Sequence, residues 1–378
     1  MNIVVIGAGI VGANVAFRLV EGGAKVTVVE AGRVGDGTSA RSFAWTNAHR
    51  KTPRAYHDLN IGGMQAHRAL RERFPQGGWW HGAGTVEWAA PGEDRDVFND
   101  RVERLRDWGY AAEIIDRARL REIEPDIDPV AVGDAPIGFF PGEGWVDPVL
   151  ITHTLLREAV RLGATLLTEQ GPARLVVRGG KAVGVACAAG EIPADLVVNC
   201  TGCWSNSITD EKRLQVPLAP TSGMLAYTAP VAANLRTVVL AAQCHMRADG
   251  AGRIVIRQDH YDRTILPGTP VDTALREASE LVAIAAQVVP SIGRAKAEAV
   301  RIGVRALPAD GKPAIGPIGG LAGYYVAVTH SGVTLAPFLG RLITEEILSG
   351  KERNELAAFR PDRFHQENAP AAVAWRED

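Results

Sequence analysis

Residues 1–30 read MNIVVIGAGIVGANVAFRLVEGGAKVTVVE, and they determine the fold class of the chain. An apolar strand leads into Gly7, Gly9 and Gly12, and an alanine-rich helix and a second apolar strand follow and end at Glu30. A strand, a glycine turn, a helix, a strand and an acid about 20 residues later are typical of a dinucleotide-binding βαβ unit. The segment therefore predicts an α/β domain with a parallel sheet buried on both faces.

Each glycine of this unit has a separate physical task. Gly7 permits the tight turn, Gly9 lets the backbone approach a pyrophosphate, and Gly12 lets the helix pack against its strand. The first amides of the helix would bind phosphate oxygens. Glu30 would accept hydrogen bonds from a ribose diol and would repel a 2′-phosphate. The unit alone leaves NAD and FAD both open.

The composition excludes several classes of function. The chain has 378 residues, enough for two domains, and its net charge of −2 without a basic run offers no field for nucleic acid or an anionic membrane. No apolar run approaches the roughly 18 residues that span a bilayer, and a strand that starts at Asn2 leaves no room for a signal peptide. The four cysteines form no secreted-type framework. We therefore expect a cytoplasmic protein that acts on a small molecule.

A loop rich in glycine and hydroxyl groups follows the second strand. It contains Gly37, Thr38 and Ser39, with Arg41 and Ser42 directly behind them. Amides and hydroxyls of this kind bind pyrophosphate oxygens. An ordinary solvent loop is the alternative, but such a loop would need neither the arginine nor three hydroxyls leading into apolar residues.

Periodicity along the rest of the chain predicts both helices and strands. Helices are expected at 56–74, 94–109, 116–124, 149–162 and 273–289, the fourth capped by Asp147. Strands are expected at 79–89, 174–177, 182–186, 196–200, 224–228, 238–242 and 253–257. The strands after residue 209 have the pattern of a separate antiparallel sheet.

The last organised block, 300–350, contains a second combination of strand, glycine loop and helix. Its strand at 324–328 runs into His330, Ser331 and Gly332, and the helix that follows ends at Gly350. Residues beyond 350 are polar and are expected to be peripheral.

In chain order, these motifs resemble the D-amino-acid oxidase-like superfamily of FAD enzymes, which includes glycine oxidase, sarcosine oxidase and the D-amino-acid dehydrogenases. The resemblance covers nearly the whole chain. It is carried by the glycine unit with Glu30, the loop at 37–39, GWVDP at 144–148, VVNCTGCW at 197–204, GVR at 303–305, PADGKPAIG at 308–316 and HSG at 330–332.

The resemblance implies FAD as the dinucleotide and a Rossmann-like, α/β plus α+β architecture. It implies an FAD-binding domain built from the discontinuous segments 1–42, 143–208 and 303–350. A substrate domain with a mostly antiparallel sheet would comprise 43–142 and 209–302, leaving 351–378 as a peripheral tail. The FAD is expected to be non-covalent, because no cysteine lies near Arg305 and Arg41 stands where some dehydrogenase relatives place a flavin-linking histidine.

The motifs and the resemblance together give a set of expected cofactor contacts. They are Gly7, Gly9, Ile10, Val11, Gly12, Glu30, Ala31, Gly37, Thr38, Ser39, Arg41, Ser42, Ala173, Thr201, Gly202, Gly303, Arg305, Gly332, Val333 and Thr334.

The resemblance also implies the reaction type. In the family, flavin N5 accepts hydride from the carbon that bears an amine, which gives an imine. Arg305 occupies the position of a substrate-carboxylate arginine, whose fork suits a bidentate pair; a structural salt bridge is the alternative. His330 is the best-placed acid–base candidate, although it could be a structural histidine. Tyr56, Tyr227 and Tyr261 are equal candidates for an active-site tyrosine.

Two other signals are weaker. Cys200 and Cys203 form a CxxC pattern, but it ends a strand instead of opening a helix, so small residues packed near the flavin are the better interpretation. No metal-binding motif is present, and a metal is not expected.

Three functions are compatible with these residues. The first is oxidation of the C–N bond of an amino acid or secondary amine, with O2 or another electron acceptor. The second is a flavin-dependent 2-hydroxy acid dehydrogenase, and the third is a flavin-binding subunit of a hetero-oligomeric dehydrogenase. Arg305 without an evident histidine base favours the first, because an alcohol must lose its hydroxyl proton whereas a neutral amine need not. The substrate, the choice between oxidase and dehydrogenase, and the oligomeric state stay open.

Overall fold

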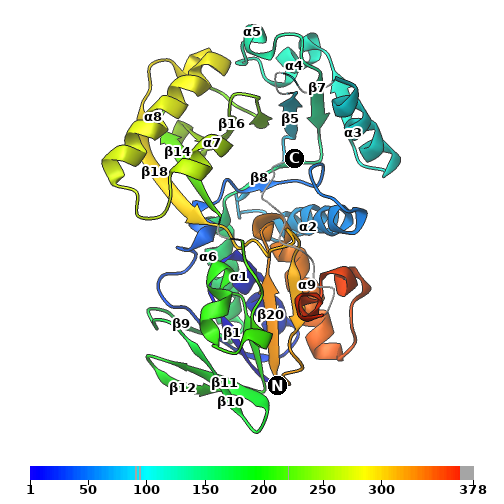
Figure 1. Ribbon diagram of the computed structural model, residues 1–378, viewed down its shortest axis with the longest axis vertical. Helices are drawn as coiled ribbons and strands as arrows, with labels where there is room; N and C mark the ends of the chain where they lie inside the picture. Colours follow the sequence, from blue (N-terminus) through cyan, green and yellow to red (C-terminus); the bar gives the residue numbers. More distant parts are fainter. Residues whose placement is uncertain (90–91, 93–94, 220, 367–378) are drawn as a thin grey trace.

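The computed structural model describes residues 1–89, 92, 95–219 and 221–366. Its strands gather in two large sheets, one in the lower half and one in the upper half of Figure 1. The lower sheet has the strand order β19-β20-β13-β1-β2-β9, and the upper sheet has the order β18-β14-β17-β16-β15-β5-β7-β6. The pairing of each sheet follows from the burial of its strands.

The six-stranded sheet contains the opening unit. Its strands are β1 (Asn2–Ile6), β2 (Lys25–Val29), β9 (Thr165–Leu167), β13 (Leu196–Asn199), β19 (Ala314–Pro317) and β20 (Tyr324–Val328). They pair in parallel except for β19, which runs antiparallel on β20. Every residue of β20 is buried, as expected for a strand covered on both faces. The parallel sheet predicted from residues 1–30 is confirmed.

Three long helices cover one face of this sheet: α1 (Ile10–Glu21), α6 (Pro148–Arg161) and α9 (Gly332–Ser349). A Cβ atom on Gly340 would lie 2.8 Å from the carbonyl oxygen of Asn14, so α9 and α1 pack backbone to backbone. Figure 1 shows both helices beside β1 and β20. A small antiparallel sheet of β10 (Arg174–Arg178), β11 (Lys181–Cys187) and β12 (Gly190–Pro193) packs on the other face.

The ends of these helices agree with the expected caps. The Asp147 side chain accepts hydrogen bonds from the amides of Val149 and Leu150 at the start of α6. Gly350 ends α9 with φ +67°, a conformation that favours glycine. Both predicted caps are confirmed.

Gly12 brings α1 onto the turn that follows β1. A Cβ atom on Gly12 would lie 1.9 Å from the carbonyl oxygen of Gly7 and 3.3 Å from Cβ of Cys200. Gly7 itself has φ +98°, a conformation that side chains rarely adopt. The packing role predicted for Gly12 is confirmed, because the contact leaves no room for a methyl group.

The eight-stranded sheet is antiparallel in the described chain apart from the parallel pair β5–β15. Its strands are β5 (Thr85–Trp88), β6 (Glu113–Ile115), β7 (Ile137–Phe140), β14 (Ser222–Thr228), β15 (Val238–Leu240), β16 (His245–Asp249), β17 (Arg253–Arg257) and β18 (Ala297–Val304). Helix α8 (Val271–Val288) packs on one face (Figure 1), against Met224 and Ile254 among others. Leu225 and Val255 turn to the opposite face.

Further helices and a small sheet surround these two sheets. The helices are α2 (Arg54–Arg73), α3 (Arg95–Asp107), α4 (Arg117–Ile123), α5 (Pro129–Val132) and α7 (Asp259–Thr264). The remaining strands β3 (Trp45–Thr46), β8 (Gly144–Val146) and β4 (Trp80–His81) form a small antiparallel sheet. The strand predicted at 79–89 is therefore divided between β4 and β5, and residue 94 of the predicted 94–109 helix lies outside the described residues.

The segment after α9 is less peripheral than the sequence predicts. Leu356 and Phe359 are fully buried in the core under α9. Arg360 pairs with Glu346, and Arg363 pairs with Asp310 at 2.9 Å. The segment 351–366 is therefore anchored to the core by a few buried side chains, although most of its residues are exposed, and 367–378 lie outside the described residues.

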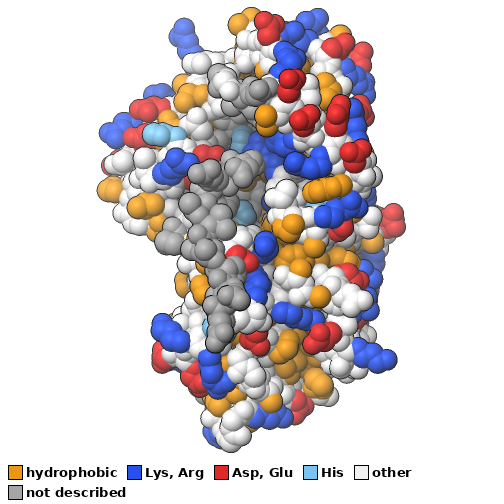
Figure 2. All heavy atoms as spheres, turned by 45° about the vertical axis from the view of Figure 1, so that its right-hand side comes forward, with side chains coloured by type: hydrophobic (Ala, Val, Ile, Leu, Met, Phe, Trp, Pro, Cys, Tyr) orange, Lys and Arg blue, Asp and Glu red, His pale blue; other side chains and the backbone are white. Residues whose placement is uncertain are grey.

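The surface agrees with the small net charge of the chain. Figure 2 shows acidic and basic side chains on the same face of the molecule. In the described part of the chain, no helix combines the length and apolarity that a membrane crossing needs.

We expect Gly12→Ala to lower the stability of the protein by about 1–3 kcal/mol, because its methyl group would overlap the Gly7 carbonyl. The loss would occur although alanine is the better helix former. Thermal unfolding followed by circular dichroism measures it. Gly250→Ala is the matched control, since a Cβ atom there would meet nothing within 4 Å. Equal melting temperatures of the two variants would contradict the packing role.

Candidate active site

A pocket of about 800 Å³ opens where the two large sheets approach each other. The lower sheet contributes the glycine turn after β1, the 30–42 loop, the end of β13 and the start of α9. The upper sheet contributes residues of β14 and β17. The volume is in the range of pockets that bind small molecules and cofactors.

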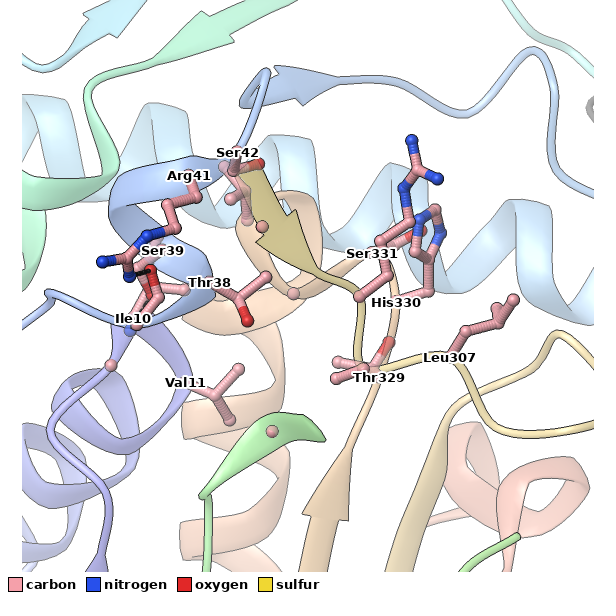
Figure 3. Close-up of a pocket in the computed structure, with 18 of the residues that line it drawn as sticks. Ile10, Val11, Thr38, Ser39, Arg41, Ser42, Leu307, Thr329, His330 and Ser331 are labelled. Carbon is pink, nitrogen blue, oxygen red and sulfur yellow. Dashed lines mark hydrogen bonds between the residues drawn. The ribbon is translucent and has the colours of Figure 1, made fainter. Parts of the chain in front are cut away.

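The predicted cofactor contacts come together in this pocket. Among the described residues, Gly12 is the one member of the predicted set outside the pocket lining, because it packs α1 against Gly7. Figure 3 shows Ile10, Val11 and the 38–42 loop on one side, with Thr329, His330 and Ser331 across from them. Segments from both ends of the chain therefore form opposite walls.

Two helix N-termini are directed at the pocket. Gly9 begins α1 without a side-chain cap, and the amide of Ile10 donates to Oγ of Ser39 at 3.0 Å. Ser331 begins α9, also without a side-chain cap. The amides and partial positive charges at both helix starts are suited to phosphate or other anionic groups.

Glu30 has the position that a ribose-binding acid requires. Its Oε2 accepts a hydrogen bond from the amide of Ala8 at 2.7 Å, and its Oε1 accepts one from Gly32 at 2.9 Å. These bonds fix the carboxylate at the pocket wall. Each carboxylate oxygen can accept a further bond, which leaves capacity for a diol.

The loop after β2 is held by its own side chains. Thr38 donates to the carbonyl of Val304 at 2.7 Å. The Arg41 guanidinium turns back to Asp36, at 3.5 Å, and to the Gly37 carbonyl, at 3.0 Å. Arg41 lines the pocket, and its guanidinium is directed to its own loop. The cofactor contact that the sequence predicts for Arg41 stays a prediction. The Arg41 backbone packs against Gly303, where a Cβ atom would lie 2.9 Å from the Arg41 carbonyl oxygen.

These features fit a flavin dinucleotide. A pyrophosphate and a ribose require close backbone approach, an acid and helix N-termini directed at the ligand. The pocket provides glycine turns at Gly7 and Gly9, an acid at the end of β2, and the starts of α1 and α9, whose N-cap residues make no side-chain cap. A Cβ atom on Gly9 would lie 3.2 Å from Oγ of Ser39 and would fill the space beside the first amides of α1.

Arg305 lies in the pocket with a carboxylate partner. Its guanidinium donates to the carbonyl of Ser222 and forms an ion pair with Asp262, and the side chain is 15% exposed. Arg305 therefore forms a structural salt bridge and also lines the pocket. The remaining exposure is enough for a substrate carboxylate to approach.

Arg257 escaped the sequence analysis, and His245, which the sequence offers as one of several possible acid–base groups, lies beside it in this wall. Arg257, at the end of β17, shares Asp262 with Arg305 at 2.7 Å. Its other amine lies 3.1 Å from Nδ1 of His245, which must accept this bond, so the His245 proton resides on Nε2. The sequence signal for Arg257 was a charged residue at the end of an apolar strand.

Tyr56 is the tyrosine that the structure brings to the site. Its hydroxyl lies 2.6 Å from Oγ of Ser331, next to His330, and burial raises the pKa of Tyr56 to about 12. Tyr227 instead packs beneath Arg301, and Tyr261 belongs to the core under α8. Tyr56 is therefore a neutral hydrogen-bonding group at the start of α9.

The pocket also contains groups near the second glycine loop. Cys200 and Cys203 are both free, and burial raises the pKa of Cys200 to about 12, so this thiol is neutral. Trp204 lines the pocket and is 54% exposed, with its ring against Gly37. A tryptophan directly after a glycine loop was a signal for this position.

Comparison with known proteins agrees with a pocket that fits a flavin dinucleotide. The family described as FAD dependent oxidoreductase matches residues 2–346. Glycine oxidase of Bacillus subtilis is 26% identical over 95% of this chain and 96% of its own length. Hydrogen cyanide synthase subunit HcnC of Pseudomonas aeruginosa is 24% identical over 99% of this chain and 98% of its own. The structure of L-proline dehydrogenase from P. horikoshii has the same fold, with a TM-score of 0.82, 24% identity and coverage of 96% and 97%.

We expect Glu30→Ala to weaken FAD binding about tenfold or more, because a hydrogen bond to a charged group is worth about 1.5 kcal/mol or more. Retention of FAD after ultrafiltration, followed by flavin fluorescence, measures it. Glu122→Ala is the control, since the Glu122 side chain pairs with Arg119 on an exposed helix. Equal retention in both variants would exclude a ribose contact.

Proposed function

Because the chain belongs to the FAD dependent oxidoreductase family, we propose that it oxidises the C–N bond of an amino acid or a secondary amine. The chain is an FAD-dependent enzyme, as the family and its glycine oxidase relatives are. When bound, FAD supplies the two-electron acceptor for a hydride. The task of the protein is to bind the cofactor and orient the substrate.

The observation that supports this function best is the position of Arg305. Its planar guanidinium lies in the same pocket as the glycine loops, where it can hold a substrate carboxylate through two parallel bonds. Asp262 and the Ser222 carbonyl fix the orientation of this fork. A carboxylate held in this way places the neighbouring amine carbon toward the cofactor wall.

The start of α9 has an electrostatic role in this proposal. The amides of Gly332, Val333 and Thr334 would stabilise negative charge that develops at this end of the pocket. The Tyr56 hydroxyl holds Ser331 at 2.6 Å and so fixes the first turn of the helix. His330 lies beside this turn and is the candidate to receive a proton from the substrate amine.

Apolar residues form much of the wall between Arg305 and the cofactor loops. Phe43, Trp45, Met224 and Leu225 all line the pocket. Such a wall excludes water, which strengthens the ionic contact of a substrate carboxylate with Arg305.

A 2-hydroxy acid substrate is the second candidate. The sequence argument against it was the lack of an evident base, but the pocket contains both His245 and His330. Nδ1 of His245 already accepts a hydrogen bond from Arg257, so His330 is the better-placed group to remove a hydroxyl proton, and the lack of a base no longer separates the two chemistries.

A flavin-binding subunit is the third candidate. The relative HcnC is named as a subunit of a synthase, and it aligns with almost the whole chain. In that case the isolated chain would need its partner to turn over.

We expect small amino acids and N-substituted amino acids to reduce the flavin of the purified holoprotein, and 2-hydroxy acids of the same size to leave it oxidised. Stopped-flow bleaching of the flavin absorbance in the absence of oxygen measures this. Reduction by hydroxy acids alone would replace the first function by the second. Reduction by neither set would favour the subunit.

We expect Arg305→Ala to lower kcat/KM for carboxylate substrates about a hundredfold or more, because it removes one partner of a desolvated charge pair. FAD content should be retained. Arg276→Ala is the matched control, since Arg276 lies exposed on α8 beside Glu277. An unchanged kcat/KM in Arg305→Ala would reject the carboxylate role.

A further inference from the structure

Glu143 is a fully buried carboxylate that accepts an unusual number of hydrogen bonds. It lies in the turn between β7 and β8, directly before the GWVDP motif at 144–148. The donors are the Trp45 Nε1 group at 3.1 Å, the Ala48 amide at 3.1 Å, the His49 amide at 3.2 Å, the His49 Nδ1 group at 2.9 Å and the Tyr110 hydroxyl at 2.6 Å. All of these groups donate, so the site requires an ionised acceptor.

His49 continues the network away from Glu143. Its Nε2 lies 2.7 Å from Oε2 of Glu87, and its ring stacks on Phe140 with centroids 3.8 Å apart. Both ring nitrogens face carboxylate oxygens, and both contacts are favourable only when both nitrogens carry a proton. The buried ring is therefore held between the carboxylates of Glu143 and Glu87.

Glu87 is shared by several cations. Arg50 and Arg101 each donate to its Oε1, at 2.8 Å and 2.9 Å. Burial opposes the ionisation of Glu87, but Arg50 and then His49 hold the pKa of this carboxyl well below its usual range. Glu87 thus fixes the positions of the His49 ring and of the Arg50 and Arg101 guanidinium groups.

This network supports one wall of the pocket from behind. Residues of the 45–52 segment, Trp45, Asn47, Arg50, Lys51 and Thr52, line the cavity. The same segment supplies four of the five donors to Glu143. Two contacts hold it further: β3 pairs with β8, and the Lys51 amine lies 5.8 Å from the ring of Tyr56.

We propose that Glu143 is a positioning residue, which through His49 fixes the 45–52 segment so that Arg50 and Lys51 help to bind an anionic substrate. The proposal rests on the proposed function, since it takes a substrate with a carboxylate as the occupant of the pocket. It adds a second, cationic wall to the one formed by Arg305. The role of Glu143 is indirect, because its side chain is buried and the cations reach the cavity.

Glu143→Gln tests the proposal. The glutamine amide carries no negative charge, and its NH2 group would face at least one of the five groups that donate to Glu143. We expect KM for the amine substrate to rise about tenfold or more while kcat and FAD content change little, as expected for a misplaced binding group. Arg50→Met should raise KM in the same direction. Tyr110→Phe removes a single donor and should give a smaller rise in a chain that keeps its fold.

Glu124→Gln is the matched control for a buried carboxylate. Glu124 is also fully buried and accepts bonds from the amides of Arg236 and Thr237, but it is not among the residues that line the pocket. We expect it to lower the melting temperature with KM unchanged. A rise in KM of equal size in Glu124→Gln would show that Glu143 acts only through stability, and would overturn the proposal.

A binding measurement separates this proposal from the proposed function. Titration of the oxidised holoprotein with acetate, followed by the flavin spectrum, requires no turnover. We expect a weaker acetate affinity in Glu143→Gln and in Arg50→Met than in the unchanged protein. If amines fail to reduce the flavin, the acetate comparison still decides the role of Glu143. Equal acetate affinity in all three proteins would overturn it.

Discussion

The contact between Gly12 and the carbonyl group of Gly7 is the constraint on which the cofactor pocket depends. It brings the first turn of α1 onto the carboxyl end of β1, and the loop after β13 lies against the same turn, since a Cβ atom on Gly7 would meet the Cys200 carbonyl oxygen at 2.8 Å. Crevices at the carboxyl ends of parallel strands are where α/β sheets bind their ligands. α9 reaches this place because Gly340 lets it pack on α1.

The glycine loops of the pocket, Arg305 and His330 were predictable, whereas the polar groups around Arg305 were not. Gly7, Gly9 and Glu30 act over a short stretch of chain, so their spacing carries the geometry with it. The strand that ends at Arg257 was predicted, but β16, which begins at His245, contains two charged residues among five and so lacks the apolar pattern by which strands are recognised. The contact of Glu143 with His49 spans 94 residues, and no local pattern encodes such a distance.

Two carboxylates organise the polar part of the pocket by the same physical rule. Asp262 is shared by Arg257 and Arg305, and Glu87 is shared by His49, Arg50 and Arg101. A buried charge is costly unless it is paired and hydrogen-bonded. Sharing one carboxylate among several basic side chains fixes the position of each of them. The pocket thus combines rigid cations with apolar walls, an arrangement suited to small anionic substrates.

The distribution of the pocket over the chain has a consequence for its synthesis. The glycine turn after β1 leaves the ribosome long before its neighbour β13, which starts at residue 196, and the opposite wall at 329–334 emerges later still. Contacts between such distant segments form slowly, and unpaired strand edges are prone to aggregate. FAD therefore has no complete site on a partly made chain. We expect the cofactor to stabilise the protein only once α9 has been released, which makes its supply a late step in folding.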